Sequence, residues 1–366
     1  MATKLRPIQT IAALTARRSL STTHRYASAS SSPQIFRDVP PLRTYRRSLL
    51  LSNRTVGLVP TMGALHDGHL SLARLAAVEN TDVFISIYVN PTQFGLNEDL
   101  SSYPKTWEAD LVALETLDAE LAATPGAGRI SAVFAPTTKT MYPTLPPDSS
   151  LPGKGSFVTI TPLANLLEGA SRPVFFRGVA TICLKLFNIC TPERVYFGQK
   201  DVQQTAVIRR LAKDFHVDTT VRVGPTQREE SGLAMSSRNI YLGTRRRNVA
   251  RVLSQALRRA EAQYLAGKRT RGDILWPATA HADEVAAAQE ELDPGARAKF
   301  EVDYISLADP ETMEEVEVVD PARGAILSTA MKMLPLEEVA EGEQLGAGDD
   351  KIPVRLIDNV ILEPAE

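Results

Sequence analysis

The chain has 366 residues, of which 43% are hydrophobic and 23% charged, a composition typical of a soluble globular protein with one large or two smaller domains. A net charge of −2 argues against general binding to nucleic acid or acidic membranes, and no apolar stretch reaches the roughly 20 residues of a membrane span. Two cysteines and five scattered histidines argue against a disulfide scaffold and a structural zinc site.

The N-terminal segment differs in charge from the rest of the chain. Residues 1–37 contain six bases and no acid, so the remainder carries 35 Lys and Arg against 43 Asp and Glu, a net charge of −8. An acid-free opening rich in Arg, Ser, Thr and Ala is typical of a mitochondrial transit peptide. We therefore predict that residues 1–33 are disordered and direct the protein to mitochondria. The alternative is a disordered tail without a targeting role on a cytoplasmic protein.

From residue 55 on, short apolar runs alternate with longer amphipathic segments. The predicted strands are residues 55–59, 82–89, 132–134, 195–197 and 217–223. The predicted helices are residues 70–78, 107–121 with Thr106 as N-cap, 179–189 and 202–213. This alternation predicts an α/β domain, over residues 34–226, with a parallel sheet covered by helices on both faces. Ligands of such sheets bind beyond the carboxyl ends of the strands.

Beyond residue 226 the pattern changes. Arg-rich and Ala-rich helical sequence extends to about Glu291, and strands are predicted at residues 300–307, 325–331 and 354–362. We interpret residues 227–366 as a smaller α+β domain. The acidic, Gly-containing segment 337–350 is predicted to be a mobile excursion, and the run Arg245–Arg247 a solvated helix start.

For two further segments of the chain we predict a structural role and no part in the chemistry. The stretch 141–155 is rich in Pro, Ser and Gly, which predicts a surface loop. Cys183 and Cys190 lie seven residues apart in an apolar helical stretch, so we expect both to be core thiols.

The first motif that carries chemistry follows the strand at 55–59. Residues 60–69 read PTMGALHDGH, with His66 and His69 where a helix should begin. Backbone N–H groups at a helix N-terminus attract anions, Gly68 permits close approach of a phosphate, and imidazoles donate hydrogen bonds to phosphate oxygens. We interpret this motif as a nucleotide site; the alternative is a loop with two ordinary histidines.

The second motif, NPTQFG at residues 90–95, follows the strand at 82–89. Asn90 and Gln93 offer uncharged donors and acceptors, which suit the hydroxyls or carboxylate of a substrate. Alone, the string would equally be a turn.

The third and fourth motifs are GQKDVQQ at residues 198–204 and GLAMSSRN at 232–239. An ammonium such as that of Lys200 pairs with phosphates, and the carboxylate of Asp201 accepts from ribose hydroxyls, although Asp201 is also a plausible N-cap. The hydroxyls and arginine of the fourth motif fit a clamp for a polyphosphate.

The four motifs together resemble the HIGH/KMSKS nucleotidyltransferase superfamily. Within it, the strings PTMGALHDGH, VNPTQFG, LLEGASRP, FRGV, GQKDVQQ and GLAMSSRN resemble the pantothenate synthetase (pantoate–β-alanine ligase) family, over roughly residues 34–362. The resemblance implies a Rossmann-like fold and ATP-dependent condensation of pantoate with β-alanine through pantoyl adenylate, with release of pyrophosphate and AMP. It also implies Mg²⁺ that arrives with ATP, a homodimer, and no nucleic-acid or membrane partner.

The same resemblance assigns roles to individual residues. Those expected to carry the chemistry are His66, His69, Lys200 and Arg238, with His69 as proton donor. Those expected at ATP are Pro60, Met62, Gly63, Ala64, Leu65, His66, Asp67, Gly68, His69, Gly198, Gln199, Lys200, Asp201, Gln227, Met235, Ser236, Ser237 and Arg238. Those expected at pantoate and β-alanine are Gln93, Gln204, Asn90 and Arg172, and no protein metal site is expected.

Three positions depart from the family's pattern. Phe175 stands where the family commonly has the histidine of Arg-Pro-Gly-His-Phe, Gln199 replaces a Glu, and Gln227 replaces an apolar residue. None of these changes removes a residue expected to carry the chemistry.

Two alternative functions stay open at this point. One is another acyl-adenylate-forming ligase or nucleotidyltransferase of the same superfamily, which the pair Gln93 and Gln204 disfavours. The other is an inactive regulatory or RNA-binding relative, which the intact motifs and the acidic remainder of the chain disfavour.

Overall fold

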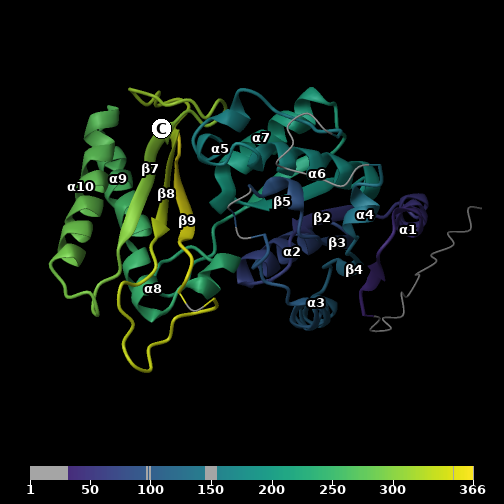
Figure 1. Ribbon diagram of the computed structural model, residues 1–366. Helices are drawn as coiled ribbons and strands as arrows, with labels where there is room; N and C mark the ends of the chain where they lie inside the picture. The colour runs from purple at the N-terminus through teal and green to yellow at the C-terminus, as the bar shows by residue number, and fades with distance from the viewer. Residues whose placement is uncertain (1–31, 96–97, 99, 145–154, 349, 366) are drawn as a thin grey trace, which may run out of the picture. The chain divides into compact units, whose positions relative to one another are not determined.

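Six parallel strands form the larger sheet of the protein, in the order β1-β4-β3-β2-β5-β6 (Figure 1). The computed structural model describes residues 32–95, 98, 100–144, 155–348 and 350–365. The strands are β1 (Gln34–Phe36), β2 (Val56–Thr61), β3 (Asp82–Ile87), β4 (Arg129–Phe134), β5 (Arg194–Gly198) and β6 (Thr220–Gly224). The segments that follow β2, β3 and β5 therefore start at one edge of the sheet, and these segments contain the first three motifs.

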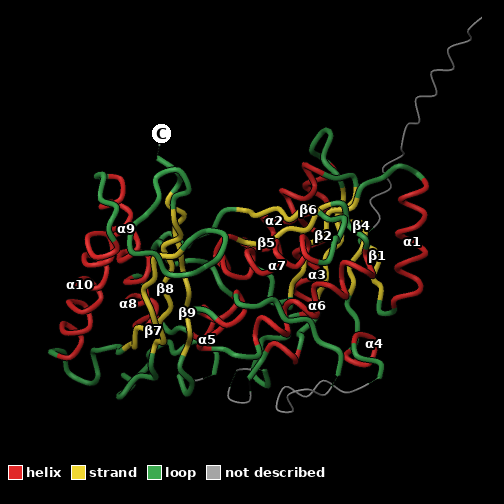
Figure 2. The backbone as a smooth tube through the Cα atoms, turned by 90° about the horizontal axis from the view of Figure 1, so that it is seen from above, coloured by secondary structure: helices red, strands yellow, loops and turns green. Residues whose placement is uncertain are grey.

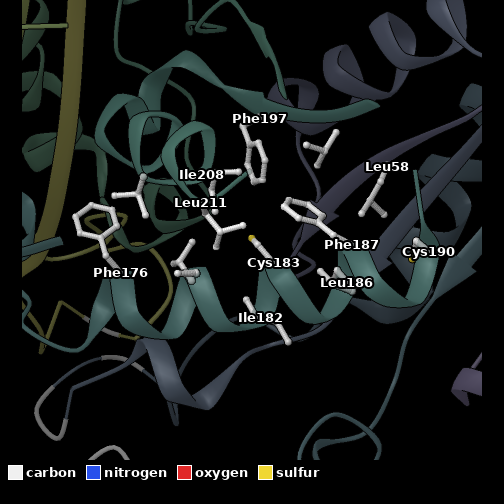
Figure 3. Close-up of a cluster of buried hydrophobic side chains, with 14 of the residues drawn as sticks. Leu58, Phe176, Ile182, Cys183, Leu186, Phe187, Cys190, Phe197, Ile208 and Leu211 are labelled. Atoms are coloured by element: carbon white, nitrogen blue, oxygen red, sulfur yellow. The ribbon is translucent and has the colours of Figure 1, made fainter. Parts of the chain in front are cut away.

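Helices cover both faces of this sheet, because side chains along each strand alternate between the two faces. The helices are α1 (Val39–Leu51), α2 (Asp67–Glu79), α3 (Trp107–Ala122), α4 (Thr138–Met141), α5 (Glu168–Ser171), α6 (Phe175–Cys190) and α7 (Val202–Asp214), with 3-10 turns η1 (Pro91–Gln93), η2 (Leu163–Asn165) and η3 (Gln199–Asp201). Leu58 and Phe84 pack with α1, α6 and α7 on one face (Figure 3). Val59 and Ile85 pack with α2 and α3 on the other.

The C-terminal part of the chain builds a second, antiparallel sheet of three strands in the order β7-β8-β9 (Figure 2). Its strands are β7 (Phe300–Ala308), β8 (Ala325–Met333) and β9 (Val354–Leu362), preceded by the 3-10 turn η4 (Ser237–Tyr241) and the helices α8 (Thr244–Ala250), α9 (Val252–Leu265) and α10 (Arg271–Glu290). Apolar side chains of α9 and α10, among them Leu257 and Ile274, pack on Leu307 and Leu327 of this sheet.

The predicted fold class is confirmed, and each strand and helix predicted between residues 55 and 223 is present with its ends shifted by a few residues. Sequence reasoning missed β1, α1 and the four-residue helices α4 and α5. β1 has three residues, and α1 opens with two prolines, so neither presents a long apolar period. The domain boundary at residues 226/227 stays a prediction, because the chain from residue 32 on forms one compact unit that contains both sheets.

Three further expectations concern the two cysteines, the loop at 141–155 and the N-terminal segment. Cys183 and Cys190 are buried in the core, as predicted (Figure 3), and burial raises the pKa of both thiols to about 12. The loop predicted at 141–155 and the segment 1–33 lie largely outside the described residues.

The arginine run begins α8, as predicted, but the prediction that it is solvated is wrong for Arg246. Arg246 is 1% exposed, and its Nε lies 2.6 Å from Oδ1 of Asp350 while its other nitrogens donate to backbone carbonyls. Arg245 pairs with Glu343, which connects the acidic segment to α8, while the predicted mobility of that segment stays a prediction. Each stretch looks solvated when taken alone, because its charge partner lies about a hundred residues away in the sequence.

This buried ion pair gives a first prediction. Asp350→Ala is expected to lower the free energy of unfolding by about 3 kcal/mol, because it leaves the Arg246 guanidinium buried without a charge partner. Urea unfolding measures the change, with the exposed Glu341→Ala of the same segment as control. Equal stability of Asp350→Ala and the wild type would contradict the role of the pair.

Candidate active site

A cavity of about 1070 Å³ lies where the predicted motifs meet. Of the predicted site residues, it is lined by Pro60, Met62, His66, Gly68, His69, Asn90, Gln93, Arg172, Gly198, Lys200, Asp201, Gln204, Gln227, Met235, Ser236, Ser237 and Arg238. Those that do not line it are Gly63, Ala64, Leu65, Asp67 and Gln199. The C-terminal part contributes further wall residues, including 353–358 at the start of β9. Most of the predicted site residues thus line one cavity, while the contribution of β9 to its wall was not foreseen.

The two histidines of the first motif lie side by side at the start of α2. His66 is the N-cap residue, its Nδ1 accepts a hydrogen bond from the Gly68 N–H at 3.1 Å, and the imidazole centroids of His66 and His69 are 4.1 Å apart. A neutral His66 therefore carries its proton on Nε2. Burial and the nearby Lys200 ammonium lower the pKa of His66 to about 4. Burial, His66 and Lys200 lower the pKa of His69 to about 3, so both imidazoles are neutral near neutral pH.

A buried carboxylate on α3 holds the loop that precedes these histidines. Asp110 is 3% exposed; its Oδ2 accepts from the Ala64 N–H at 3.0 Å and its Oδ1 from the Leu65 N–H at 2.8 Å. Gly63 and Ala64 have φ of +87° and +51°, a left-handed conformation that needs such support. Thr106 precedes α3 as predicted, but its hydroxyl donates to Asp110 Oδ1 rather than capping the helix. The residues Gly63, Ala64 and Leu65 therefore shape the loop from behind the cavity wall.

This support leads to a second prediction. Asp110→Asn is expected to raise KM for ATP about tenfold, because a carboxamide has one oxygen to accept the two loop N–H groups and turns its NH₂ toward the other. Steady-state kinetics at varied ATP measures the change. Thr106→Val is the control, since it removes a bond to Asp110 and leaves both loop bonds in place. An unchanged KM in Asp110→Asn would contradict the role of this carboxylate.

The third and fourth motifs meet the first one in the structure. Lys200 lies in η3, and its Nζ is 3.1 Å from Oδ2 of Asp201, whose side chain does not cap α7. Ser237 donates from Oγ to the Ala64 carbonyl at 3.2 Å, which joins the fourth motif to the loop of the first. The Gln227 carbonyl accepts from the Met235 N–H at 2.9 Å, so this backbone oxygen has a protein partner.

Asn90 and Gln93 occupy the second motif in different ways. The Asn90 carboxamide is buried: its Oδ1 accepts from Tyr142 and Thr92, and its Nδ2 donates to Gln93 Oε1 at 3.0 Å and to a backbone carbonyl of α6. Each polar atom of the Asn90 side chain thus has a protein partner. Gln93 keeps its Nε2 without a partner among the residues that the structure describes. Gln93 therefore lines the cavity with an amide group that can still donate, and Asn90 orients the Gln93 carboxamide.

Arg172 lines the cavity, as predicted, and its positive charge is paired with two carboxylates. Its guanidinium pairs with Glu98 and with Glu168, and it lies over the Phe175 ring at 3.8 Å from the centroid. Glu168 in turn pairs with Arg355 of β9. Phe175, the position where the family commonly has histidine, therefore serves here as a platform for the arginine.

The described part of the chain offers neither a metal cage nor a membrane-spanning helix. No group of three or more His, Cys, Asp or Glu side chains in it could hold a metal ion. None of its helices is long and apolar enough to cross a membrane. Among the cavity's carboxylates, Glu98 and Glu168 pair with Arg172, and Asp201 pairs with Lys200.

Comparison with known proteins gives one consistent result. The family model described as pantoate-beta-alanine ligase matches residues 34–361. The pantothenate synthetase of Roseiflexus sp. (strain RS-1) is 42% identical over 330 residues, which cover 90% of this chain and 99% of that protein. That of Acidobacterium capsulatum is 43% identical over 309 residues, covering 84% and 86%.

Solved structures agree with the sequence relatives. The crystal structure of pantothenate synthetase from Thermus thermophilus is similar with a TM-score of 0.69 and 34% identity, covering 89% of this chain and 98% of that one. Pantoate-beta-alanine ligase from Francisella tularensis, crystallised with beta-gamma ATP and beta-alanine, is similar with a TM-score of 0.63 and 29% identity, covering 91% and 100%.

Proposed function

Since this chain belongs to the pantoate–β-alanine ligase family, we propose that its cavity binds ATP and pantoate together and aligns them for adenylation. The protein is a ligase that joins pantoate to β-alanine at the expense of ATP, in the biosynthesis of pantothenate. The observation that carries the assignment of roles is the convergence of His66, His69 and Lys200 at the N-terminus of α2. The Lys200 ammonium lies close enough to lower the pKa of both imidazoles.

The reaction needs two displacements and no protein nucleophile. A carboxylate oxygen of pantoate attacks the α-phosphorus of ATP, the bond from that phosphorus to the β-phosphate oxygen breaks, and pyrophosphate leaves with the electron pair. The amine of β-alanine then attacks the acyl carbon, the bond to the AMP oxygen breaks, and the nitrogen loses a proton. Both steps depend on alignment and on donors placed where negative charge develops.

The residues around the first step divide into groups by the chemistry they offer. His66 and His69 donate from neutral imidazoles to phosphate oxygens, and Lys200 supplies the positive charge that offsets the charge on pyrophosphate. Ser236, Ser237 and Arg238, which line the same cavity, complete the polyphosphate site. Asp201 binds the ribose, and the Gln227 backbone borders the adenine.

Magnesium is assigned to the nucleotide rather than to the protein. Mg²⁺ is commonly bound through substrate phosphates and waters with few protein carboxylates. The carboxylates of the cavity that pair with Arg172 and Lys200 fit this arrangement, since their charge is already balanced by protein cations. When bound, the ion neutralises part of the triphosphate charge.

Pantoate is assigned to Gln93 and Gln204, which line the same cavity. Gln204→Leu is expected to raise KM for pantoate about tenfold or more while KM for ATP stays unchanged, because a leucine leaves the pantoate oxygens without their donor. Initial rates at varied pantoate measure the change, with Arg209→Ala on the exposed part of α7 as control. An unchanged KM for pantoate, or an equal rise for ATP, would contradict the assignment.

The homodimer and the cellular location stay proposals. Sedimentation of the purified protein tests the dimer. Residues 1–31, which hold most of the predicted transit segment, lie outside the described residues, and the relatives named above are bacterial, which lends the mitochondrial prediction no support. A fluorescent protein fused to residues 1–33 distinguishes the options, since a diffuse cytosolic signal would contradict import.

A further inference from the structure

Two consecutive side chains of β9 reach the walls of the ATP site from the small sheet. Asp358 is 3% exposed and Asn359 is 1% exposed. Because successive side chains of a strand point in opposite directions, the two residues contact different segments. Both are buried polar groups, and such groups are retained where their hydrogen bonds are satisfied.

Asn359 holds the segment that carries Lys200. Its Nδ2 donates to the carbonyl oxygens of Gln199 at 2.9 Å and Lys200 at 2.8 Å, and its Oδ1 accepts from the Gln199 side chain at 3.4 Å. The carboxamide thus fixes the backbone of η3 directly below the Lys200 side chain. Gln199, which does not line the cavity, contributes to the same contact.

Asp358 holds the segment that leads to the fourth motif. Its two oxygens accept from Arg228 at 2.6 and 2.9 Å, a bidentate pair in which the carboxylate is buried. Arg228 also donates to the Gly232 carbonyl at 3.1 Å and forms a backbone bridge with Ala234. This turn ends directly before Met235, so its position sets where Met235–Arg238 enters the cavity.

We propose that Asp358 and Asn359 are positioning residues of the ligase: together they fix the two phosphate-binding segments, around Lys200 and around Ser236–Arg238, relative to the small sheet. The inference rests on the proposed roles of these segments in binding ATP. Asn359 acts through Lys200, and Asp358 acts through Arg228 on the fourth motif. Neither side chain takes part in the chemistry itself.

Variants at Asn359 test the first half of the inference in pantoate-dependent ATP–pyrophosphate exchange. Asn359→Ala is expected to lower kcat/KM for ATP about tenfold, since two hydrogen bonds to η3 are lost. Asn359→Asp keeps the shape of the side chain but places an acceptor oxygen against two carbonyl oxygens. We therefore expect a larger loss of kcat/KM for ATP than in Asn359→Ala. Ser328→Ala, buried directly across from Asn359 on β8 and without a hydrogen-bond partner in the described part of the chain, is the matched control and is expected to behave as wild type.

A double-mutant cycle separates positioning from a general structural role. If Asn359 acts through Lys200, Asn359→Ala adds little further loss in a Lys200→Ala background, because coupled residues are not additive. Asp358→Asn is expected to lower kcat/KM for ATP as well, to add little to Arg238→Ala, and to add its full effect to Lys200→Ala. Thermal unfolding of each variant shows that the fraction folded at the assay temperature is unchanged.

The outcomes distinguish this inference from the function on which it rests. The inference would be overturned if Asn359→Ala lowered kcat/KM for ATP by the same factor in the wild type and in Lys200→Ala. It would also be overturned if the activity of each variant simply followed its melting temperature. Asp358→Asn, which keeps the shape of its side chain, keeps the inference falsifiable if the Asn359 variants fail to fold. A wild-type protein without exchange activity would instead contradict the proposed function.

Discussion

His69→Ala is expected to lower kcat about a thousandfold while KM for ATP changes by less than about threefold. The imidazole is neutral near neutral pH, because burial, His66 and Lys200 lower its pKa to about 3. A neutral donor gains most when charge develops on the phosphate oxygens in the transition state, so its loss falls on turnover rather than on ground-state binding. Steady-state kinetics at saturating pantoate and β-alanine separates the two constants.

The control for this variant is His216→Asn, at an exposed histidine whose positive φ of 51° an asparagine tolerates. Turnover of His69→Ala within a factor of about two of the wild type would remove His69 from the catalytic residues. The pH profile gives a further check. Since both histidine pKa values are lowered, we expect no loss of kcat/KM through imidazole protonation as the pH falls from neutrality toward about 5.

Lys200→Ala is expected to lower kcat/KM for ATP by a factor of about a hundred to a thousand, because it removes the ammonium beside the two histidines. The loss is enlarged by Asp201, whose carboxylate then stands without its partner at 3.1 Å in a site for polyphosphate. Lys200→Arg should recover part of the activity, since it restores the charge but replaces a compact ammonium with a planar fork.

Initial rates of ATP–pyrophosphate exchange measure the effect of each Lys200 variant. Lys213→Ala, at an exposed lysine near the end of α7, is the control for loss of a positive charge from the same helix region. Exchange in Lys200→Ala at the wild-type rate would show that the ammonium is not part of the phosphate site. This conclusion would hold independently of the result for His69→Ala.

The site residues that could be predicted from the sequence are those that lie within short continuous motifs. His66 and His69 sit at a junction of strand and helix, and such a junction has a recognisable pattern of small and polar residues. Lys200 belongs to a similar junction, and Ser237 lies in a short motif in the loop after β6. Short-range patterns therefore located the segments that line the cavity without knowledge of how they pack together.

The residues that hold these segments in place were not predicted. Asp110 contacts the first loop from 46 residues away, and Asn359 contacts Lys200 from 159 residues away. In the sequence each is one polar residue within a helix or strand, and no local pattern distinguishes it from a solvated one. The same reason explains the wrong prediction for Arg246, whose partner Asp350 lies in another segment. The ion pairs of Arg172 were not predicted for the same reason, since Glu98 and Glu168 come close to it only in the fold.

Activation of pantoate as its adenylate in this cavity can be measured by ATP–pyrophosphate exchange with the purified full chain. The assay contains Mg²⁺, ATP, labelled pyrophosphate and pantoate, and no β-alanine. We expect exchange that requires pantoate, and conversion to AMP and pantothenate once β-alanine is added. A folded, ATP-binding protein that gives no exchange, or equal exchange without pantoate, would contradict the account.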